Sequence, residues 1–279
     1  MFLAPALIGL VVLTIGPIIA SFALSFTDWN LLGAPRFVGL RNFEKLLADP
    51  SFWRAFVNTI IFTAVSVPIG MALSLGLALA LDRKMRGIGI YRTLFLLPLI
   101  ASSVATALIF GLLLDAFVGP VNYILRQLGL PQPGWFGDPF WAMVGIIMMS
   151  IWKGFGFNVV IFMAGLQGIP RELYEAAEID GANRRQRFRH ITMPMLSATT
   201  FFVLVIAIIA SFQVFDTAWV LTKGGPQEST LTLVYYVYQT GFQQLRMGYA
   251  SSIAYVLFAV TMIMVGAQWL WQRRWVHYQ

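Results

Sequence analysis

The stretch that decides the fold is residues 55–81, AFVNTIIFTAVSVPIGMALSLGLALAL, which holds no charged side chain over its 27 residues. The hydrocarbon core of a membrane is about 30 Å thick, and about 20 helical residues cross it. The stretch lacks the alternating pattern of a lipid-facing barrel strand, and a segment in lipid must pair its backbone groups internally. We therefore predict a transmembrane helix here.

Small residues recur along the second half of this stretch, where they allow a neighbouring helix to come close. They are Gly70, Ala72, Ser74, Gly76, Ala78 and Ala80. The pattern predicts tight helix packing and does not by itself indicate a function.

Five further apolar runs surround this one, at residues 2–26, 93–117, 140–166, 197–221 and 249–271. The chain of 279 residues is 58% hydrophobic and only 11% charged, against about 25% charged for a soluble domain. No internal repeat or linker divides it. We expect an all-α membrane protein of about six transmembrane helices in a single domain, residues 1–279, with short helices outside the spans at residues 40–47 and 121–128.

The first run has a competing interpretation as a signal peptide. It is longer than a typical hydrophobic signal region of about 7–15 residues, and it contains Pro5 and Pro17, so a span is favoured. No basic residue precedes it, which is consistent with a natural N-terminus that is longer or trimmed.

The net charge of +7 indicates membrane orientation rather than nucleic-acid binding, because the basic residues lie in short segments between apolar runs. With six spans, both termini share one side of the membrane with loops 82–92 and 167–196. That side carries eleven Lys and Arg residues, against seven on the other side. The positive-inside rule then predicts that both termini are cytoplasmic.

Composition excludes several kinds of chemistry. Without cysteine there is no disulfide, thiolate metal site or cysteine nucleophile, and two histidines, His190 and His277, are too few for a histidine cluster. The chain contains neither a GxxxxGK[ST] phosphate loop nor an HExxH motif. We expect no catalytic residue, no metal site and no cofactor in this chain.

The loop at about residues 167–196 reads as a helix, a turn and a second helix. Pro170 suits a first helical position, Gly181 suits the left-handed residue that ends a helix, and Asn183 can cap the helix that follows. The first helix has a small apolar face, formed by Leu173, Ala176 and Ala177. The second helix is basic and carries Arg184, Arg185, Arg187 and Arg189. On composition alone, an ordinary loop whose arginines only fix topology remains the alternative.

The spacing within this loop matches a known family. The pattern runs through Glu175, Ala176, Ala177, Gly181, Ile191, Met193 and Pro194. It resembles the EAA loop of permease subunits in binding-protein-dependent ABC importers, where a leucine usually takes the place of Met193. The resemblance covers nearly the whole chain and looks like the sugar and glycerol-phosphate branch. It is carried by residues 25–29 (SFTDW), 37–40 (FVGL), 42–43 (NF), 91–95 (YRTLF), 97–98 (LP), 152–158 (WKGFGFN), 211–216 (SFQVFD) and 221–226 (LTKGGP).

The resemblance implies a type I ABC importer permease in the plasma membrane of a bacterium or archaeon. It implies as partners a second homologous permease subunit, two ATPase subunits that bind ATP and Mg²⁺, an extracytoplasmic solute-binding protein and membrane lipid. Residues 175–181 would form a coupling helix that docks in a groove of the ATPase. The coupling residues implied are Glu175, Ala176, Ala177, Asp180, Gly181, Ala182 and Phe188.

Polar side chains within the fourth and fifth runs are candidate substrate contacts, since such groups are costly in a membrane and mark a pathway or a helix contact. Aromatic rings there can stack on sugars, and amides can form hydrogen bonds with hydroxyls. Lys153 is the most telling, because a lysine deep in a span needs an acceptor, water or a substrate group. The candidate pathway residues are Ser150, Trp152, Lys153, Gly154, Phe157, Asn158, Ser211 and Gln213; for each, helix packing is the alternative. Of these, Ser150, Lys153, Gly154, Phe157 and Ser211 are included because the resemblance implies substrate contacts at the matching positions.

A secondary transporter or channel for small polar solutes is the alternative function. It would work without partner subunits, and it predicts internal repeats and ionisable residues spread among the spans. The sequence leaves the solute open among sugars, oligosaccharides, polyols and glycerophosphate-type compounds.

Overall fold

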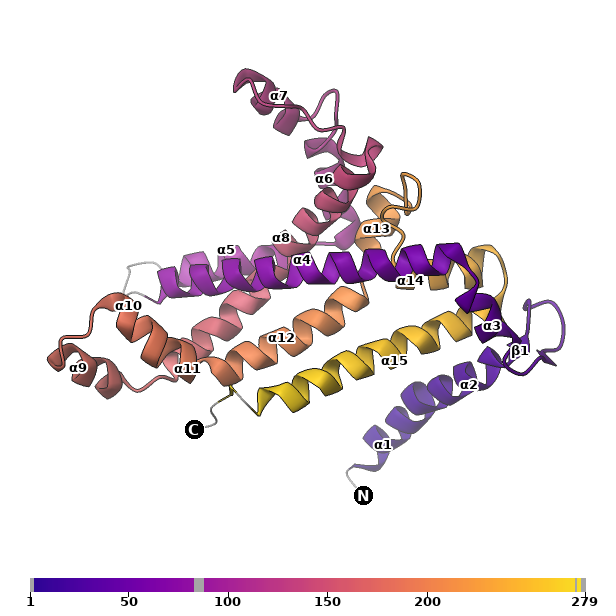
Figure 1. The fold of residues 1–279 in the computed structure, drawn as a ribbon, viewed down its shortest axis with the longest axis horizontal. Coiled ribbons are helices and arrows are strands. Elements are labelled where there is room, and N and C mark those ends of the chain that lie inside the picture. Colours follow the sequence, from indigo (N-terminus) through magenta and orange to yellow (C-terminus); the bar gives the residue numbers. More distant parts are fainter. Residues whose placement is uncertain (1–2, 83–87, 274, 277–279) are drawn as a thin grey trace.

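The computed structural model describes residues 3–82, 88–273 and 275–276. Long helices lie side by side and an arm projects from them (Figure 1). Within the described residues, β1 (Thr27–Asp28) and β2 (Arg36–Phe37) form the one sheet, an antiparallel pair of two strands. The fold is all-α, as predicted.

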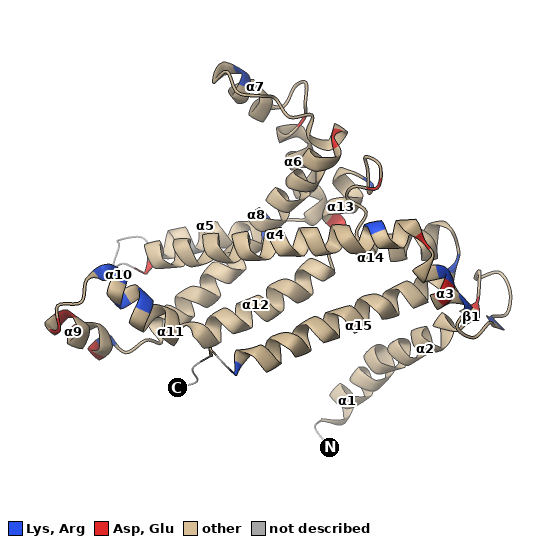
Figure 2. Cartoon of the chain, viewed as in Figure 1, with Lys and Arg blue, Asp and Glu red and all other residues tan. Residues whose placement is uncertain are grey.

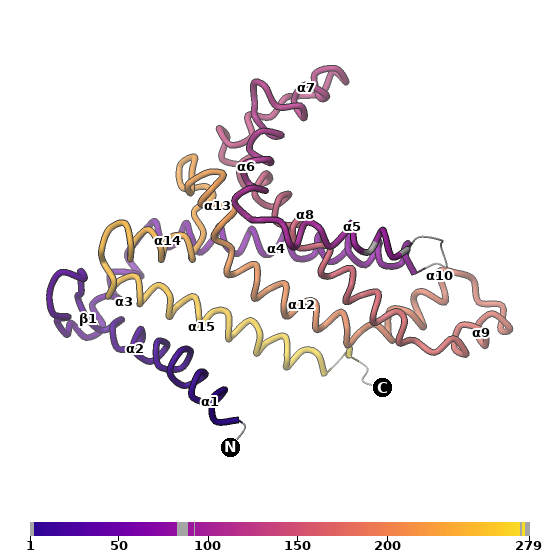
Figure 3. Tube along the Cα trace, turned by 180° about the vertical axis from the view of Figure 1, so that it is seen from behind, coloured from indigo at the N-terminus to yellow at the C-terminus, as the bar shows by residue number. Residues whose placement is uncertain are grey.

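Five continuous helical segments of the described chain are long and apolar enough to cross a membrane. The first consists of α1 (Ala4–Leu10), the π-helical turn η1 (Val11–Ile15) and α2 (Gly16–Ser25). The others are α4 (Pro50–Leu81), α8 (Pro139–Gln167), α12 (Ser197–Phe212) with α13 (Asp216–Leu221), and α15 (Met247–Gln272). α12 lies between α4 and α15, and α2 packs against α15 (Figures 1 and 3). These segments agree with the predicted runs to within a few residues.

The predicted third span is wrong as a single helix. It consists of α5 (Ile88–Ile100) and α6 (Ser103–Leu113), and the chain bends by 96° between them. Ser102 precedes α6 with an extended backbone, at a ψ of 131°, so the helical hydrogen-bond ladder stops there. Counting the bent pair as one span gives six in the described chain, which confirms the predicted number.

Contact between α4 and α8 is the most extensive in the bundle. Gly70, Ser74 and Ala78 lie one helical turn apart and are buried. Ser74 Oγ lies 2.7 Å from Gly70 O and 3.1 Å from Phe155 O of α8. The other small residues, Ala72, Gly76 and Ala80, are exposed. The predicted close packing therefore involves one face of the helix only.

Two short helices lie outside the spans. α3 (Arg41–Leu47) and α7 (Pro120–Gln127) form almost where short helices are predicted, and α7 lies at the tip of the arm made by α6 and the start of α8 (Figure 1). The turn η2 (Trp135–Gly137) packs under α7 through a bond of 2.8 Å from Trp135 Nε1 to Asn122 Oδ1.

Asp49 joins three helices at the start of α4. It caps α4, and its Oδ2 accepts hydrogen bonds of 2.5 Å from the hydroxyls of Tyr236 and Tyr249. Tyr236 belongs to α14 (Leu233–Tyr238), which the π-helical turn η4 (Gln239–Gln243) follows. Burial alone would raise the pKa of the Asp49 carboxyl, but these hydrogen bonds and that of the Ser51 amide outweigh burial and lower it. The ionised carboxylate is thus the form that holds the three helices together.

Candidate functional site

The loop between α8 and α12 contains the predicted helix and turn. α9 (Arg171–Ile179) is followed by a turn at Gly181, which has the left-handed φ of +74°. The Ala182 amide donates to Ala177 O at 2.8 Å and the Gly181 amide to Glu178 O at 3.1 Å, which satisfies carbonyls at the helix end. The helix begins one residue later than predicted, with Pro170 just outside it.

The second helix of the loop is less regular than predicted. Asn183 does cap it, through reciprocal bonds with Gln186: the Gln186 amide donates to Asn183 Oδ1 at 3.0 Å, and the Asn183 amide to Gln186 Oε1 at 2.7 Å. However, α10 (Arg184–Arg187) gives way to the π-helical turn η3 (Phe188–Thr192) before α11 (Met193–Met195) leads into α12.

The loop helix α9 stands out from the bundle with none of its residues buried. Its outward apolar side chains are Leu173 and Ile179, of which Ile179 is 87% exposed. Tyr174 ties α9 to η3 through a hydrogen bond of 2.9 Å with Thr192. Acidic residues lie on α9 and basic ones on α10 (Figure 2). The arrangement presents a free helix that another protein surface can cover.

The predicted coupling residues fall in three places. Glu175, Ala176 and Ala177 lie on α9, Asp180, Gly181 and Ala182 form the turn after it, and Phe188 begins η3 as a half-buried residue.

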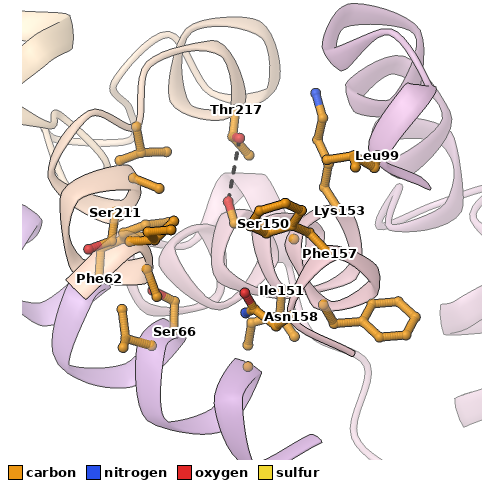
Figure 4. A pocket seen from close by; sticks show the side chains of 18 residues that line it. Phe62, Ser66, Leu99, Ser150, Ile151, Lys153, Phe157, Asn158, Ser211 and Thr217 are labelled. Carbon is orange, nitrogen blue, oxygen red and sulfur yellow. Dashed lines mark hydrogen bonds between the residues drawn. The ribbon is translucent and has the colours of Figure 1, made fainter. Parts of the chain in front are cut away.

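A cavity of about 330 Å³ lies among α4, α8, α12 and α13. Six of the eight predicted pathway residues line it: Ser150, Lys153, Gly154, Phe157, Asn158 and Ser211. Of the five that belong to α8, four lie three, four, seven and eight positions after Ser150, and residues at such spacings share one face of a helix. Figure 4 shows Ser150, Phe157 and Asn158 on α8 and Ser211 on α12 around the cavity.

Two predicted residues lie elsewhere. Trp152 is two positions from Ser150, which turns it to another face of α8, where its ring lies 5.6 Å from that of Phe110. Gln213 is exposed at the end of α12, where the chain turns into α13.

Other helices supply polar groups that sequence reasoning missed. Thr217 of α13 lies 3.4 Å from Ser150 across the cavity (Figure 4), and Ser66 of α4 lines it. Thr63 Oγ1 lies 2.9 Å from the Ser211 hydroxyl. A signal was present for α4: Thr63, Ser66 and Gly70 lie at i, i+3 and i+7 within residues 55–81.

Lys153 alone carries a charge among the described residues that line this cavity. Its ammonium extends away from Ser150 and Asn158 (Figure 4) and donates a hydrogen bond to the hydroxyl of Ser103, the first residue of α6. A lysine inside a span requires an acceptor, and Ser103, at the bend of the third span, supplies it here.

Comparison with known proteins identifies the family. The profile described as "Binding-protein-dependent transport system inner membrane component" matches residues 46–275. The lactose transport system permease protein LacF of Rhizobium radiobacter is 38% identical and covers 92% of this chain and 88% of its own length. The sn-glycerol-3-phosphate permease UgpA of Agrobacterium fabrum is 36% identical over 87% of this chain and 83% of its own.

A solved structure agrees. The crystal structure of a bacterial ABC transporter that imports the acidic polysaccharide alginate contains a chain that matches with a TM-score of 0.85 and 26% identity, over 98% of this chain and 94% of that one. These findings do not favour a secondary transporter or channel. The chain belongs to the family of binding-protein-dependent transport system inner membrane components and is a permease subunit of an ABC importer.

Proposed function

We propose that this chain forms part of the translocation pathway for a sugar, oligosaccharide or glycerophosphate-type solute. The observation that carries the proposal is the cavity among α4, α8, α12 and α13, whose lining combines hydroxyls, an amide and an ammonium with the ring of Phe157. Such a lining can form hydrogen bonds with hydroxyls and stack on a sugar face. Relatives named for lactose, sulfoquinovosyl glycerol and sn-glycerol-3-phosphate support this solute class.

The energy for transport comes, in this proposal, from two separate ATPase subunits that bind ATP and Mg²⁺. A second homologous permease completes the pathway, and a solute-binding protein delivers the solute; a related alginate transporter has been solved with its periplasmic protein. Residues 175–181 dock on an ATPase. Because α8 leads directly into α9 and α11 leads directly into α12, movement of this loop acts on two of the helices that line the cavity.

The same proposal places the chain in the plasma membrane of a bacterium or archaeon, with both termini and the loop containing α9 in the cytoplasm. Relatives from Bacillus subtilis and Pyrococcus horikoshii are permeases of this kind. The excess of Lys and Arg on that side supports the orientation.

Single cysteines test the orientation, because the chain has none of its own. Leu32 is 83% exposed near the β1–β2 pair, and Glu172 is exposed on α9. With a membrane-impermeant maleimide, Leu32→Cys should label in intact cells or spheroplasts, and Glu172→Cys only after permeabilisation. The reverse pattern would reject the orientation.

Replacing Lys153 by Met tests the substrate contact. Met keeps the length and the apolar stem but removes the charge and the donors. Losing a hydrogen bond from a charged group costs about 1.5–3 kcal/mol, so we expect the solute concentration at half-maximal transport to rise on the order of 10- to 100-fold in an assembled complex.

Ser103→Ala is the matched control, since it removes the other partner of Lys153. If Lys153 only ties α8 to α6, both variants should show the same defect. If Lys153 contacts the solute, Lys153→Met alone should weaken solute affinity. Wild-type transport by Lys153→Met at subsaturating solute would rule out the contact.

A further inference from the structure

A second cavity, of about 610 Å³, lies at the other end of α4 and α8 from the arm. The last turns of these spans contribute Leu79, Asp82 and Leu166. The loop between α8 and α12, called the coupling loop below, contributes the rest, which are Tyr174, Arg184, Arg185, Arg187, Phe188 and Thr192. Of the predicted coupling residues only Phe188 lines it, and the docking of residues 175–181 proposed above does not use the cavity.

The lining is rich in positive charge. Three of the nine described lining residues are arginines, and one, Asp82, is acidic. A further carboxylate, Glu178, lies outside the lining and bonds to Arg187 at 3.0 Å. Arg184 and Arg185 are exposed, and their side chains form no ion pair within the described chain. Figure 2 shows these basic residues gathered on α10. Arginine presents planar pairs of donors that match phosphate oxygens.

The position of the cavity matches a membrane surface. α4 ends at Leu81 and α8 at Gln167, both spans by their length and composition. Apolar Leu79 and Leu166 line the part next to the spans, whereas the arginines come from the loop beyond. Basic pockets between transmembrane helices on the cytoplasmic side are suited to anionic lipid headgroups.

We propose that this cavity binds the phosphate of an anionic lipid headgroup and so holds the coupling loop against the membrane surface. The inference rests on the proposed function for the cytoplasmic orientation of the loop. Free phosphate shares the same chemistry, and the experiment separates the two sources. A lipid seated between α4, α8 and η3 fixes the loop relative to the spans that it moves, so anionic lipid should increase solute-stimulated ATP hydrolysis.

The test uses the assembled transporter in nanodiscs of phosphatidylcholine, with and without phosphatidylglycerol. Retained phosphatidylglycerol is counted by native mass spectrometry, and ATPase activity is measured in parallel. The variant is Arg184→Gln/Arg185→Gln. Its matched control is Arg171→Gln/Arg189→Gln, which removes the same charge from the same loop at positions outside the cavity lining.

Each arginine near a membrane surface contributes about 1 kcal/mol to anionic lipid binding, so the first variant should bind phosphatidylglycerol on the order of 30-fold more weakly. The control should retain it within a few-fold, and Arg184→Lys/Arg185→Lys should keep most of it because lysine still binds phosphate as a point charge. Stimulation by phosphatidylglycerol should follow the same order.

Equal phosphatidylglycerol retention by Arg184→Gln/Arg185→Gln and by its control would overturn the inference. So would a thermal stabilisation by inorganic phosphate that depends on Arg184 and Arg185 without any retained lipid. Solute transport by the wild-type complex in sealed vesicles that contain phosphatidylglycerol is the separate measure of the proposed function. Its absence would count against that function, whereas intact transport with lipid retention that does not depend on Arg184 and Arg185 would count against this cavity only.

Discussion

Replacing Gly156 by Ala should separate α5 from α8 and abolish transport. A Cβ at position 156 would lie 1.8 Å from the carbonyl oxygen of Phe95 and 2.9 Å from its carbon. The obstacle is backbone, so no side chain can rotate away. Overpacking of this kind typically costs about 1–3 kcal/mol, occasionally more, and we expect about 3 kcal/mol because a whole helix must shift. Thermal unfolding of the purified complex measures the loss.

Gly156→Ala should lose transport as well as stability, because α5 and the helix after it contribute to the cavity that contains Lys153. Leu99 of α5 lines the cavity that contains Lys153, and α6, which follows the bend, carries Ser103, the hydrogen-bond partner of Lys153. Gly76→Ala in α4 is the matched control, since a Cβ there meets nothing within 4 Å. It should transport normally. Unchanged unfolding and transport in Gly156→Ala would show that α5 does not approach α8 this closely in the membrane.

Hydropathy located the spans well but could not give their direction in space. Residues 93–117 are mostly apolar, which predicts one helix, yet the extended backbone at Ser102 turns α6 by 96° from α5. Serine favours both helix starts and packing faces, so its presence alone does not predict a break. Likewise, small residues in α4 indicated close packing, but only tertiary contacts decide that Ser74 faces α8 and Gly76 does not.

For the cavity among α4, α8, α12 and α13, the sequence likewise predicts the lining within one helix but not the lining that depends on tertiary structure. Within α8, helical periodicity determines that Ser150, Gly154 and Phe157 share a face and that Trp152 does not. Thr217 reaches the cavity because the chain turns between α12 and α13, a geometry that no local pattern specifies. The helix ends of the coupling loop were predictable, by contrast, because capping by Asn183 and the left-handed turn at Gly181 depend on neighbours in sequence.

The turn at Gly181 gives the second large effect, because Gly181→Val should uncouple the transporter. The residue holds a φ of +74°, and a Cβ there would meet nothing within 4 Å, so the penalty is one of backbone conformation and not of space. A side chain in this region costs roughly 1–2 kcal/mol, and a β-branched one is a true outlier there. The turn should therefore change its backbone angles and redirect α9 relative to α10, which would misalign residues 175–181 with the ATPase subunit of the proposed complex.

Solute-stimulated ATPase activity and transport should fall together in Gly181→Val, by on the order of tenfold if about 1.4 kcal/mol of coupling is lost. Gly181→Asn is the discriminating control, because asparagine tolerates the left-handed conformation while adding a side chain of similar size. It should keep most of the activity. If Asn and Val are equally harmful, the ATPase excludes any side chain at this position and the backbone argument fails. If Val couples as well as glycine in an assembled complex, the turn is not a coupling element.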